Sequence, residues 1–355
     1  MKKKEQLLIK SLYSFKSEKN IKYMEHFTPE VLGHLFFNRM SAVAYETLRK
    51  SNMLNKVNRE IRTSLRDSYN KSLEKDISFF ECVHELSETL SGCDCDYAML
   101  KGAYLCYRYP VGYRTANDID LLVRPNDVSK IGKALSESGF KQGYIRNDSF
   151  VPATRQEIIE SKMTRGETVP YIKEVNLPGM KFLEIDINFS LDFKNGNKAL
   201  VEELLDRAVL IKIVDYEIKT LNPIDFFIHL CCHLYKEATT LPWIEMKRDM
   251  TLYKYCDIYL LLEDREVNVL DVFERAKNLG VEKECAFAII QTAKLFNMTN
   301  DYAHYIASNV LASDPDFLHR IYDPKTGKYY LYAEKDIGKR FFHINRKKLL
   351  KEAEL

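Results

Sequence analysis

The chain has little of what marks several structural classes. Its 355 residues include 13 glycines and 10 prolines, a composition that excludes collagen-like and low-complexity proteins and argues against a turn-rich all-β fold. Lysine and arginine number 53 and acidic residues 51, so the net charge gives no reason to expect nucleic-acid binding, although a local basic patch is compatible with it. No apolar run reaches the length of about 18 residues that predicts a transmembrane helix.

The N-terminus and the cysteines point to the same compartment. Lys10 interrupts the apolar stretch that follows the basic first residues, and no small-residue cleavage site follows, which argues against a signal peptide. The eight cysteines include one C-x-C pair, Cys93 and Cys95, which is a poor zinc signature. We therefore expect buried, reduced thiols in a cytoplasmic protein that does not enter a membrane.

Hydrophobic spacing divides the chain into regions of different character. Hydrophobic residues make up 46% of the sequence, which is enough for a substantial core and roughly two domains. Residues 1–95 are predicted to be helical, because apolar residues recur at intervals of three and four in 31–48 and 77–90. A polar helix is expected between them, at 57–76. Residues 96–220 contain short strands and helices instead.

The strands of this middle region are bounded by turn signals. They are predicted at 97–100, 117–125, 140–144, 168–175 and 181–191. Residues 221–355 return to helical spacing and are predicted to form a C-terminal helical domain. Their basic tail, 321–355, is expected to be a solvated basic helix, with contact to an acidic acceptor such as RNA as the alternative. The expected fold class is α+β: a small mixed-sheet module at 96–220, flanked by N- and C-terminal helical regions.

The most informative segment is the strand-like Asn117-Asp-Ile-Asp-Leu-Leu-Val123. Alternate side chains of a strand share a face, so Asp118 and Asp120 point one way while Ile119 and Leu121 point the other. Two neighbouring carboxylates repel each other, and a divalent cation that prefers hard oxygen ligands, such as Mg²⁺, relieves that repulsion. A solvated aspartate pair at the end of a strand is the alternative interpretation.

A second acidic strand strengthens the metal-binding hypothesis. In residues 182–189, Glu184, Asp186 and Asn188 share one face, and apolar residues occupy the other. If this strand lies beside the first, Asp118, Asp120 and Asp186 converge and can hold two Mg²⁺ ions about 4 Å apart, as in two-metal phosphoryl transfer. Glu184 competes for the third position, but Asp186 is favoured because it lies deeper in the alternating run.

These residues resemble a known family. Lys101-Gly102-Ala103, then Arg114 and the N-D-I-D-L-L-V strand, look like the nucleotidyltransferase superfamily of the DNA polymerase β type. The likeness is closest to a bacterial group of largely uncharacterised nucleotidyltransferase-like proteins. It extends into a helical segment, Pro223-x-x-Phe-x-x-His-Leu-x-x-His233, and so covers about 97–260.

The resemblance implies roles for further residues. Lys101, the backbone N–H groups of Gly102 and Ala103, and Arg114 would bind the phosphates of a nucleoside triphosphate. The wider superfamily has a serine or a second glycine where this chain has Ala103, so phosphate contact there would rest on backbone N–H groups. On the C-terminal helices, Lys236 and Asp257 are further nucleotide-binding candidates. We expect these helices to form one wall of the active-site cleft.

The expected function follows from both lines of reasoning. The sequence predicts a Mg²⁺-dependent nucleotidyltransferase that transfers a nucleotidyl group from a nucleoside triphosphate to an unidentified hydroxyl-bearing acceptor: RNA, a protein, a peptide or a small molecule. Two Mg²⁺ ions are expected, and the net charge does not indicate a nucleic acid. The alternative is a non-catalytic nucleotide-binding or regulatory protein on the same scaffold.

Overall fold

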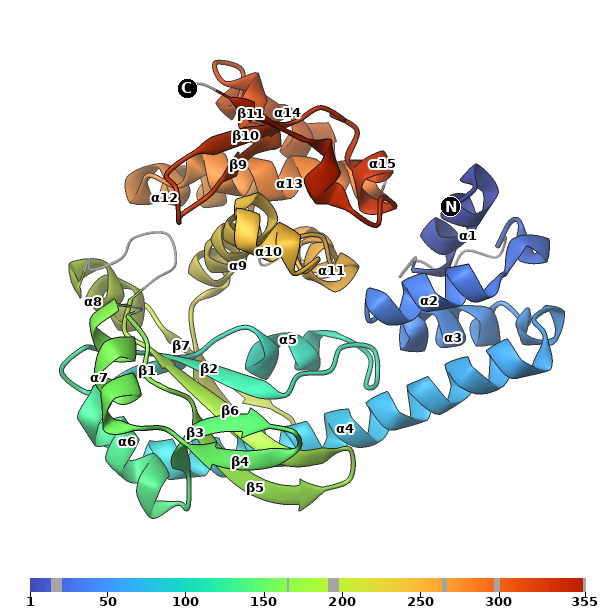
Figure 1. Cartoon of the computed structure of the whole chain (residues 1–355). Helices are drawn as coiled ribbons and strands as arrows, with labels where there is room; N and C mark the ends of the chain where they lie inside the picture. The colour runs from blue at the N-terminus through green and yellow to red at the C-terminus, as the bar shows by residue number, and fades with distance from the viewer. Residues whose placement is uncertain (14–20, 165, 191–197, 264–266, 297–300, 354–355) are drawn as a thin grey trace. The chain divides into compact units, whose positions relative to one another are not determined.

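The computed structural model describes residues 1–13, 21–164, 166–190, 198–263, 267–296 and 301–353 (Figure 1). Contacts between Cα atoms divide the chain into two compact units. One unit is Asn70–Phe226, and the other combines Met1–Tyr69 with Phe227–Leu355. The regions before and after the predicted α/β module therefore belong largely to a single unit.

The Asn70–Phe226 unit is built on an eight-stranded mixed sheet with the order β4-β3-β5-β6-β2-β1-β8-β7. Its strands are β1 (Tyr97–Met99), β2 (Asp118–Val123), β3 (Lys141–Arg146), β4 (Ser149–Pro152), β5 (Tyr171–Leu177), β6 (Met180–Asn188), β7 (Val209–Ile213) and β8 (Tyr216–Thr220). The pairs β2/β6 and β1/β8 are parallel, and the other pairs are antiparallel. The predicted α+β class is confirmed, with a larger sheet than expected, because β4, β7 and β8 were not among the strands predicted from the sequence.

Helices flank the sheet of this unit. They are α4 (Arg59–Ser91, from residue 70), α5 (Gly102–Arg108), α6 (Val128–Glu137), α7 (Arg155–Thr164), α8 (Lys198–Asp206) and the start of α9 (Pro223–Thr239). On β5, Lys173 and Tyr171 lie opposite Leu183 and Ile185 of β6 and share their face. Lys173 binds Glu85 of α4 at 2.5 Å, and the Tyr171 hydroxyl lies against α6, at Gly132. Both helices therefore pack on the face opposite the carboxylates (Figure 1).

Two helix predictions differ from the structure at their boundaries. The segments predicted as separate helices at 57–76 and 77–90 form one helix of 33 residues, α4. The segment 31–48 is instead two helices, α2 (Pro29–Phe37) and α3 (Ser41–Lys50). Arg39, between them, has a φ of 57°, which ends the first helix because a right-handed helix cannot continue through that conformation. The predicted N-cap, Thr28, accepts a hydrogen bond from the Val31 N–H.

The other unit is helical except for one small sheet. Besides α2, α3 and the rest of α4 and α9, it contains α1 (Lys3–Leu12), α10 (Leu241–Glu245), α11 (Leu252–Leu262), α12 (Val269–Leu279), α13 (Glu282–Phe296), α14 (Asp301–Val310) and α15 (Ile337–Phe341). Its three strands are β9 (Arg320–Tyr322), β10 (Tyr329–Tyr332) and β11 (Leu350–Ala353), in the order β11-β10-β9.

The prediction that the basic tail is a solvated helix is wrong. A turn held by Asp323, which accepts hydrogen bonds from the Lys325 N–H and the Thr326 hydroxyl, reverses the chain between β9 and β10. Two of the tail's basic side chains, Arg340 and Arg346, are buried, with 3% and 5% exposure. Tertiary contacts have therefore overridden the local charge pattern.

Two further findings hold within the described residues. No helix there combines the length and apolar character needed to cross a membrane. All eight cysteines lie outside disulfides, and six of them are buried.

Candidate active site

The two acidic strands lie side by side, as predicted. Strands β2 and β6 pair in parallel, with Asp118 opposite Glu184 and Asp120 opposite Asp186. Neighbouring strands are about 4.8 Å apart, and paired residues of a parallel sheet point to the same face. The register therefore brings four acidic side chains to one face of the central strands, while Ile119 and Leu121 pair with Ile185 and Ile187 on the other face.

Burial and mutual repulsion perturb two of these carboxyl groups, Glu184 and Asp186. Asp120 is buried, Asp118 is exposed, and Glu184 and Asp186 are half-buried. The pKa of Asp186 is raised to about 8, first by burial and then by the charges of Asp120, Glu184, Asp118 and Glu167. Burial and the charges of Asp118 and Asp120 also raise the pKa of Glu184. Perturbed carboxyl groups of this kind are frequent at functional sites.

Lys101 is the cationic partner of this acidic face. Its Nζ lies 2.8 Å from Oδ1 of Asp120, so the ammonium group neutralises a buried carboxylate. The residue immediately precedes α5 and has a φ of 45° and a ψ of −115°, which is an unfavourable conformation for a side chain with a Cβ atom. The Leu100 N–H, which bonds to the Asp120 carbonyl at 2.8 Å, helps to fix the turn beside the strand.

Gly102 meets a packing requirement at this turn. A Cβ atom at this position would lie 2.7 Å from Cβ of Ala116, so only glycine fits without displacing the neighbouring backbone. The N–H groups of Gly102 and Ala103 are at the start of α5, where the helix supplies no acceptor for them. Helix α5 has seven residues, in line with the short helices expected in this region.

Arg114 lies in a loop that is held by a residue the sequence analysis missed. Asp76, on α4, is completely buried and accepts a hydrogen bond from the Gly112 N–H at 2.6 Å. Burial raises the pKa of Asp76 to about 7, against the opposing effects of the Gly112 N–H, Arg114 and Lys75. The Arg114 Nη1 donates to the Thr115 carbonyl at 2.9 Å. Asp76 stands at helical spacing from the buried Phe79 and Val83 and therefore lies on the buried face of α4. A carboxylate at such a position was the sequence signal that could have identified it.

Glu167 is a second acidic residue that the sequence analysis did not select. It forms a β-bridge with Asn188 at the end of β6, and its charge contributes to the raised pKa of Asp186. It lies outside the predicted polar face of 182–189, immediately before the different strand that the sequence pattern predicts at 168–175. The proximity of Glu167 to Asp186 depends on strand pairing between distant parts of the chain, which the sequence alone does not reveal.

The donor set suits a hard cation, but the side chains are not gathered around one point. Carboxylate oxygens are the ligands that Mg²⁺ prefers, and a cation would relieve the repulsion that raises the pKa of Asp186. In the described residues, however, no group of three or more His, Cys, Asp or Glu side chains is close enough to hold a metal ion as it stands. Binding would therefore require Asp120 to exchange Lys101 for the cation and the neighbouring carboxylates to turn.

Two predicted nucleotide-binding residues belong to the other unit. Lys236 is exposed on α9, and Asp257 is buried on α11, with 4% exposure. On the same part of α9, the His229 and His233 rings stack with their centroids 6.3 Å apart, and His233 lies 3.6 Å from Glu237. The roles of Lys236 and Asp257 toward a nucleotide stay predictions.

Comparison with known proteins decides the family. A family model described as "Uncharacterised nucleotidyltransferase" matches residues 29–297. The chain belongs to this family. A nucleotidyltransferase-like antigenic protein from Paracoccidioides brasiliensis is similar in structure, with 14% identity, a TM-score of 0.35, and coverage of 69% of this chain and 89% of that chain. No match to a curated protein is found.

The family match confirms the resemblance inferred from the L-K-G turn and the N-D-I-D-L-L-V strand. The region that matches the family model extends well beyond the 97–260 segment that carried the resemblance. It includes α2, α3, all of α4 and most of the C-terminal helices. Helical segments that precede and follow the sheet-containing unit along the chain therefore fall within the region shared by the family.

Proposed function

We propose that this protein is a Mg²⁺-dependent enzyme that transfers a nucleotidyl group from a nucleoside triphosphate to a hydroxyl-bearing acceptor. The observation that carries the proposal is the parallel register of β2 and β6, which gathers four acidic side chains on one face beside Lys101. Family membership supplies the matching reaction class. The acceptor is an RNA, a protein, a peptide or a small molecule.

In this reaction the acceptor oxygen bonds to the α-phosphorus, and the bond from that phosphorus to the β-phosphate oxygen breaks, so that pyrophosphate leaves. Bound Mg²⁺ would supply neutralisation of the charge that develops on the phosphate oxygens. Asp118, Asp120 and Asp186 are the proposed ligands, with Glu184 as the alternative to Asp186. Asp186, which lies opposite Asp120 in the register, is also the proposed acceptor of the proton from the acceptor hydroxyl.

The turn before α5 and the loop before β2 are the proposed phosphate-binding elements. Lys101 already lies at the acidic face, 2.8 Å from Asp120, and its ammonium group would turn to the triphosphate when Asp120 binds a cation. Arg114 provides a planar guanidinium that can bind phosphate oxygens in pairs. The N–H groups of Gly102 and Ala103 would add short-range donors. Catalysis would depend mainly on positioning and charge neutralisation.

One observation favours the alternative, a nucleotide-binding protein without catalysis. The Lys101 ammonium group occupies the position beside Asp120 that a cation would need, and no group of three or more carboxylates among the described residues is close enough to hold a metal ion. If Lys101 stayed there permanently, the protein could bind a nucleotide without transferring part of it. The two functions differ in whether pyrophosphate is released.

The test is pyrophosphate release by the full-length protein with each of the four NTPs, with Mg²⁺ or with EDTA, and with RNA or the protein itself as acceptor. We expect Mg²⁺-dependent release that falls by about 10²–10³-fold in Asp120→Asn. Asp215→Asn, which changes an exposed aspartate in the β7–β8 turn of the same unit, is the matched control and should retain full activity. Nucleotide binding without release by the wild-type protein would instead support the non-catalytic alternative.

A further inference from the structure

Two segments of the unit that contains the C-terminal helices carry exposed basic residues. Arg39 lies just beyond α2, and Lys247 and Arg248 lie just beyond α10. Among the described residues, none of these three side chains forms an ion pair with a carboxylate. The nearby Glu245 is already paired, since it binds Lys347 at 2.6 Å. A local excess of positive charge therefore remains, although the net charge of the whole chain is small.

The two segments lie against each other. The first N–H of α11 donates to Oδ1 of Asn38 at 3.1 Å, and the guanidinium carbon of Arg39 lies 5.0 Å from the centre of the Tyr253 ring. Nζ of Lys254 lies 5.8 Å from the centre of the same ring and donates to the Arg248 carbonyl at 3.2 Å. Contacts therefore run from Arg39 through Tyr253 and Lys254 to Arg248.

Aromatic side chains lie among these cations. The ring centre of Trp243, the only tryptophan in the chain, lies 5.4 Å from Nζ of Lys254. Trp243 and Tyr253 are half-buried, and Phe36 and Phe37, which end α2, have exposed fractions of 44% and 49%. A surface on which cations alternate with aromatic rings is typical of proteins that bind single-stranded nucleic acid, because phosphates pair with the cations and bases stack on the rings.

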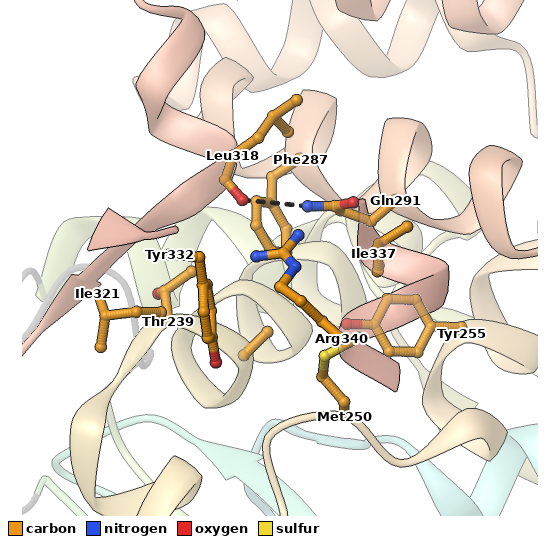
Figure 2. A pocket seen from close by; sticks show the side chains of 11 residues that line it. Thr239, Met250, Tyr255, Phe287, Gln291, Leu318, Ile321, Tyr332, Ile337 and Arg340 are labelled. Atoms are coloured by element: carbon orange, nitrogen blue, oxygen red, sulfur yellow. Dashed lines mark hydrogen bonds between the residues drawn. The ribbon is translucent and has the colours of Figure 1, made fainter. Parts of the chain in front are cut away.

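The inner side of the second segment is fixed in the core. Asp249 accepts hydrogen bonds from Nε and Nη2 of Arg346 at 2.7 and 2.6 Å, and both residues are buried. Met250 and Tyr255 line a small internal cavity (Figure 2). The exposed side chains of this segment therefore extend from a backbone that is held in place, so less conformational entropy is lost when they bind a ligand.

Arg39 and Lys247 also occupy unfavourable backbone conformations. Their φ values are 57° and 59°, in the left-handed region, at the ends of α2 and α10. In both cases the N–H of the next residue bonds back to a carbonyl of the helix, at 2.8 and 2.9 Å. Glycine is the usual residue at this helix-closing position. A long basic residue there costs free energy, which indicates that its side chain has a role of its own.

We propose that this surface binds single-stranded RNA as the acceptor of the transfer reaction. The basic–aromatic surface consists of Phe37, Arg39, Trp243, Lys247, Arg248 and Tyr253. Its three unpaired cations would each contact one phosphate, whereas Lys254 adds no net charge because it pairs with Glu237. Unpaired bases can stack on the rings, which the bases inside a duplex cannot reach. The role of RNA as acceptor rests on the proposed function, but the binding of RNA does not.

Fluorescence anisotropy of a labelled oligouridylate of about 12 nucleotides measures binding to the full-length protein without NTP. We expect the logarithm of the binding constant to fall with the logarithm of salt concentration with a slope of about −2, because about 0.7 counterions are released for each of three phosphates. The fluorescence of Trp243 should fall on binding. The cation variant, Arg39→Gln/Lys247→Gln/Arg248→Gln, should bind at least about 10-fold more weakly at ~0.1 M salt, with a slope close to zero.

Lys328→Gln/Lys335→Gln/Lys339→Gln is the matched control, because these three lysines are exposed on the same unit and paired with carboxylates. It should keep the affinity and the slope of the wild type. The inference is overturned if single-stranded RNA does not bind, if a duplex of the same length binds equally well, or if the two triple variants lose affinity equally. If the cation variant does not fold, Lys247→Gln alone decides, with an expected change in slope of about 0.7.

Transfer is measured separately, with Mg²⁺, NTP labelled at the α-phosphate and the same RNA. Label on the RNA, together with a raised KM for the RNA in the cation variant, supports the whole inference. An unchanged KM for the RNA in that variant would overturn the basic–aromatic surface as the acceptor site. RNA binding with transfer only to another class of acceptor would overturn RNA as the acceptor and leave the proposed function standing.

Discussion

Asp76→Asn is expected to stabilise the protein above neutral pH. Asp76 is completely buried, and its Oδ2 accepts the Gly112 N–H while Oδ1 has no partner among the described residues. Burial raises its pKa from 3.8 to about 7. Between these values the folded protein binds the proton more tightly than the unfolded chain, so this group's contribution to stability falls as the pH rises through that window. Asparagine removes the charge and keeps an oxygen for Gly112.

The size of the effect follows from the same pKa. A change from 3.8 to about 7 corresponds to a ceiling of about 4 kcal/mol, at about 1.4 kcal/mol for each unit of pH. The measured gain should be smaller, because the folded structure relaxes around a buried charge and the amide of asparagine brings a donor that needs an acceptor. We expect Asp76→Asn to be more stable than the wild type by about 1–3 kcal/mol at about pH 8. Below about pH 4 the difference should disappear.

Urea unfolding at several pH values between about 4 and 8 measures this difference. Asp67→Asn, which changes an exposed aspartate on the same helix, should show no comparable gain. Asp76→Ala should destabilise the protein at about pH 4, because it leaves the Gly112 N–H buried without its acceptor, and this loss should shrink as the pH rises, because alanine also removes the buried charge. The reasoning is refuted if Asp76→Asn lowers stability at pH 8, or if the difference from the wild type does not grow with pH.

Three further predictions concern the turn before α5 and the acidic face. Gly102→Ala should destabilise the protein by roughly 1–3 kcal/mol in urea unfolding, because the new Cβ would meet Ala116 at 2.7 Å. Gly33→Ala is the control, because a Cβ at Gly33 would have nothing within 4 Å, and it should be neutral or stabilising. Equal losses of stability in the two variants would contradict the packing argument. Lys101→Met should lower kcat/KM for the NTP at least about 10-fold, and an unchanged value would remove Lys101 from the phosphate site. Asp186→Asn should abolish transfer in a steady-state assay while the protein stays folded, whereas full activity would transfer the role of third carboxylate to Glu184.

The sheet arrangement at the site was predictable because it depends on short-range alternation. The period-two pattern of 117–123 and 182–189 separates carboxylates from apolar residues, and two such strands keep both apolar faces in the core only when their carboxylates share the opposite face. Asp118, Asp120, Glu184 and Asp186 therefore had to share a face once the strands paired. The family's L-K-G turn placed Lys101 and Gly102 close to them.

Other features depend on contacts between distant parts of the chain and could not be predicted. Asp76 looked like one polar residue among many on a charged helix, and its partner, Gly112, is 36 residues away. Glu167 joins the acidic group through a bridge to Asn188. The basic tail was interpreted from its charge, although Arg340 and Arg346 are buried by the elements packed around them.

The most direct test of the central claim follows the fate of the nucleotide's phosphates. The full-length protein is incubated with Mg²⁺, a candidate acceptor, and the same NTP labelled at either the α- or the γ-phosphate. A nucleotidyltransferase leaves the α-label on the acceptor and releases the γ-label with pyrophosphate, and Asp118→Asn should lose both signals. A γ-label on the acceptor, or labels that remain together in intact NTP with every acceptor tested, would contradict the account.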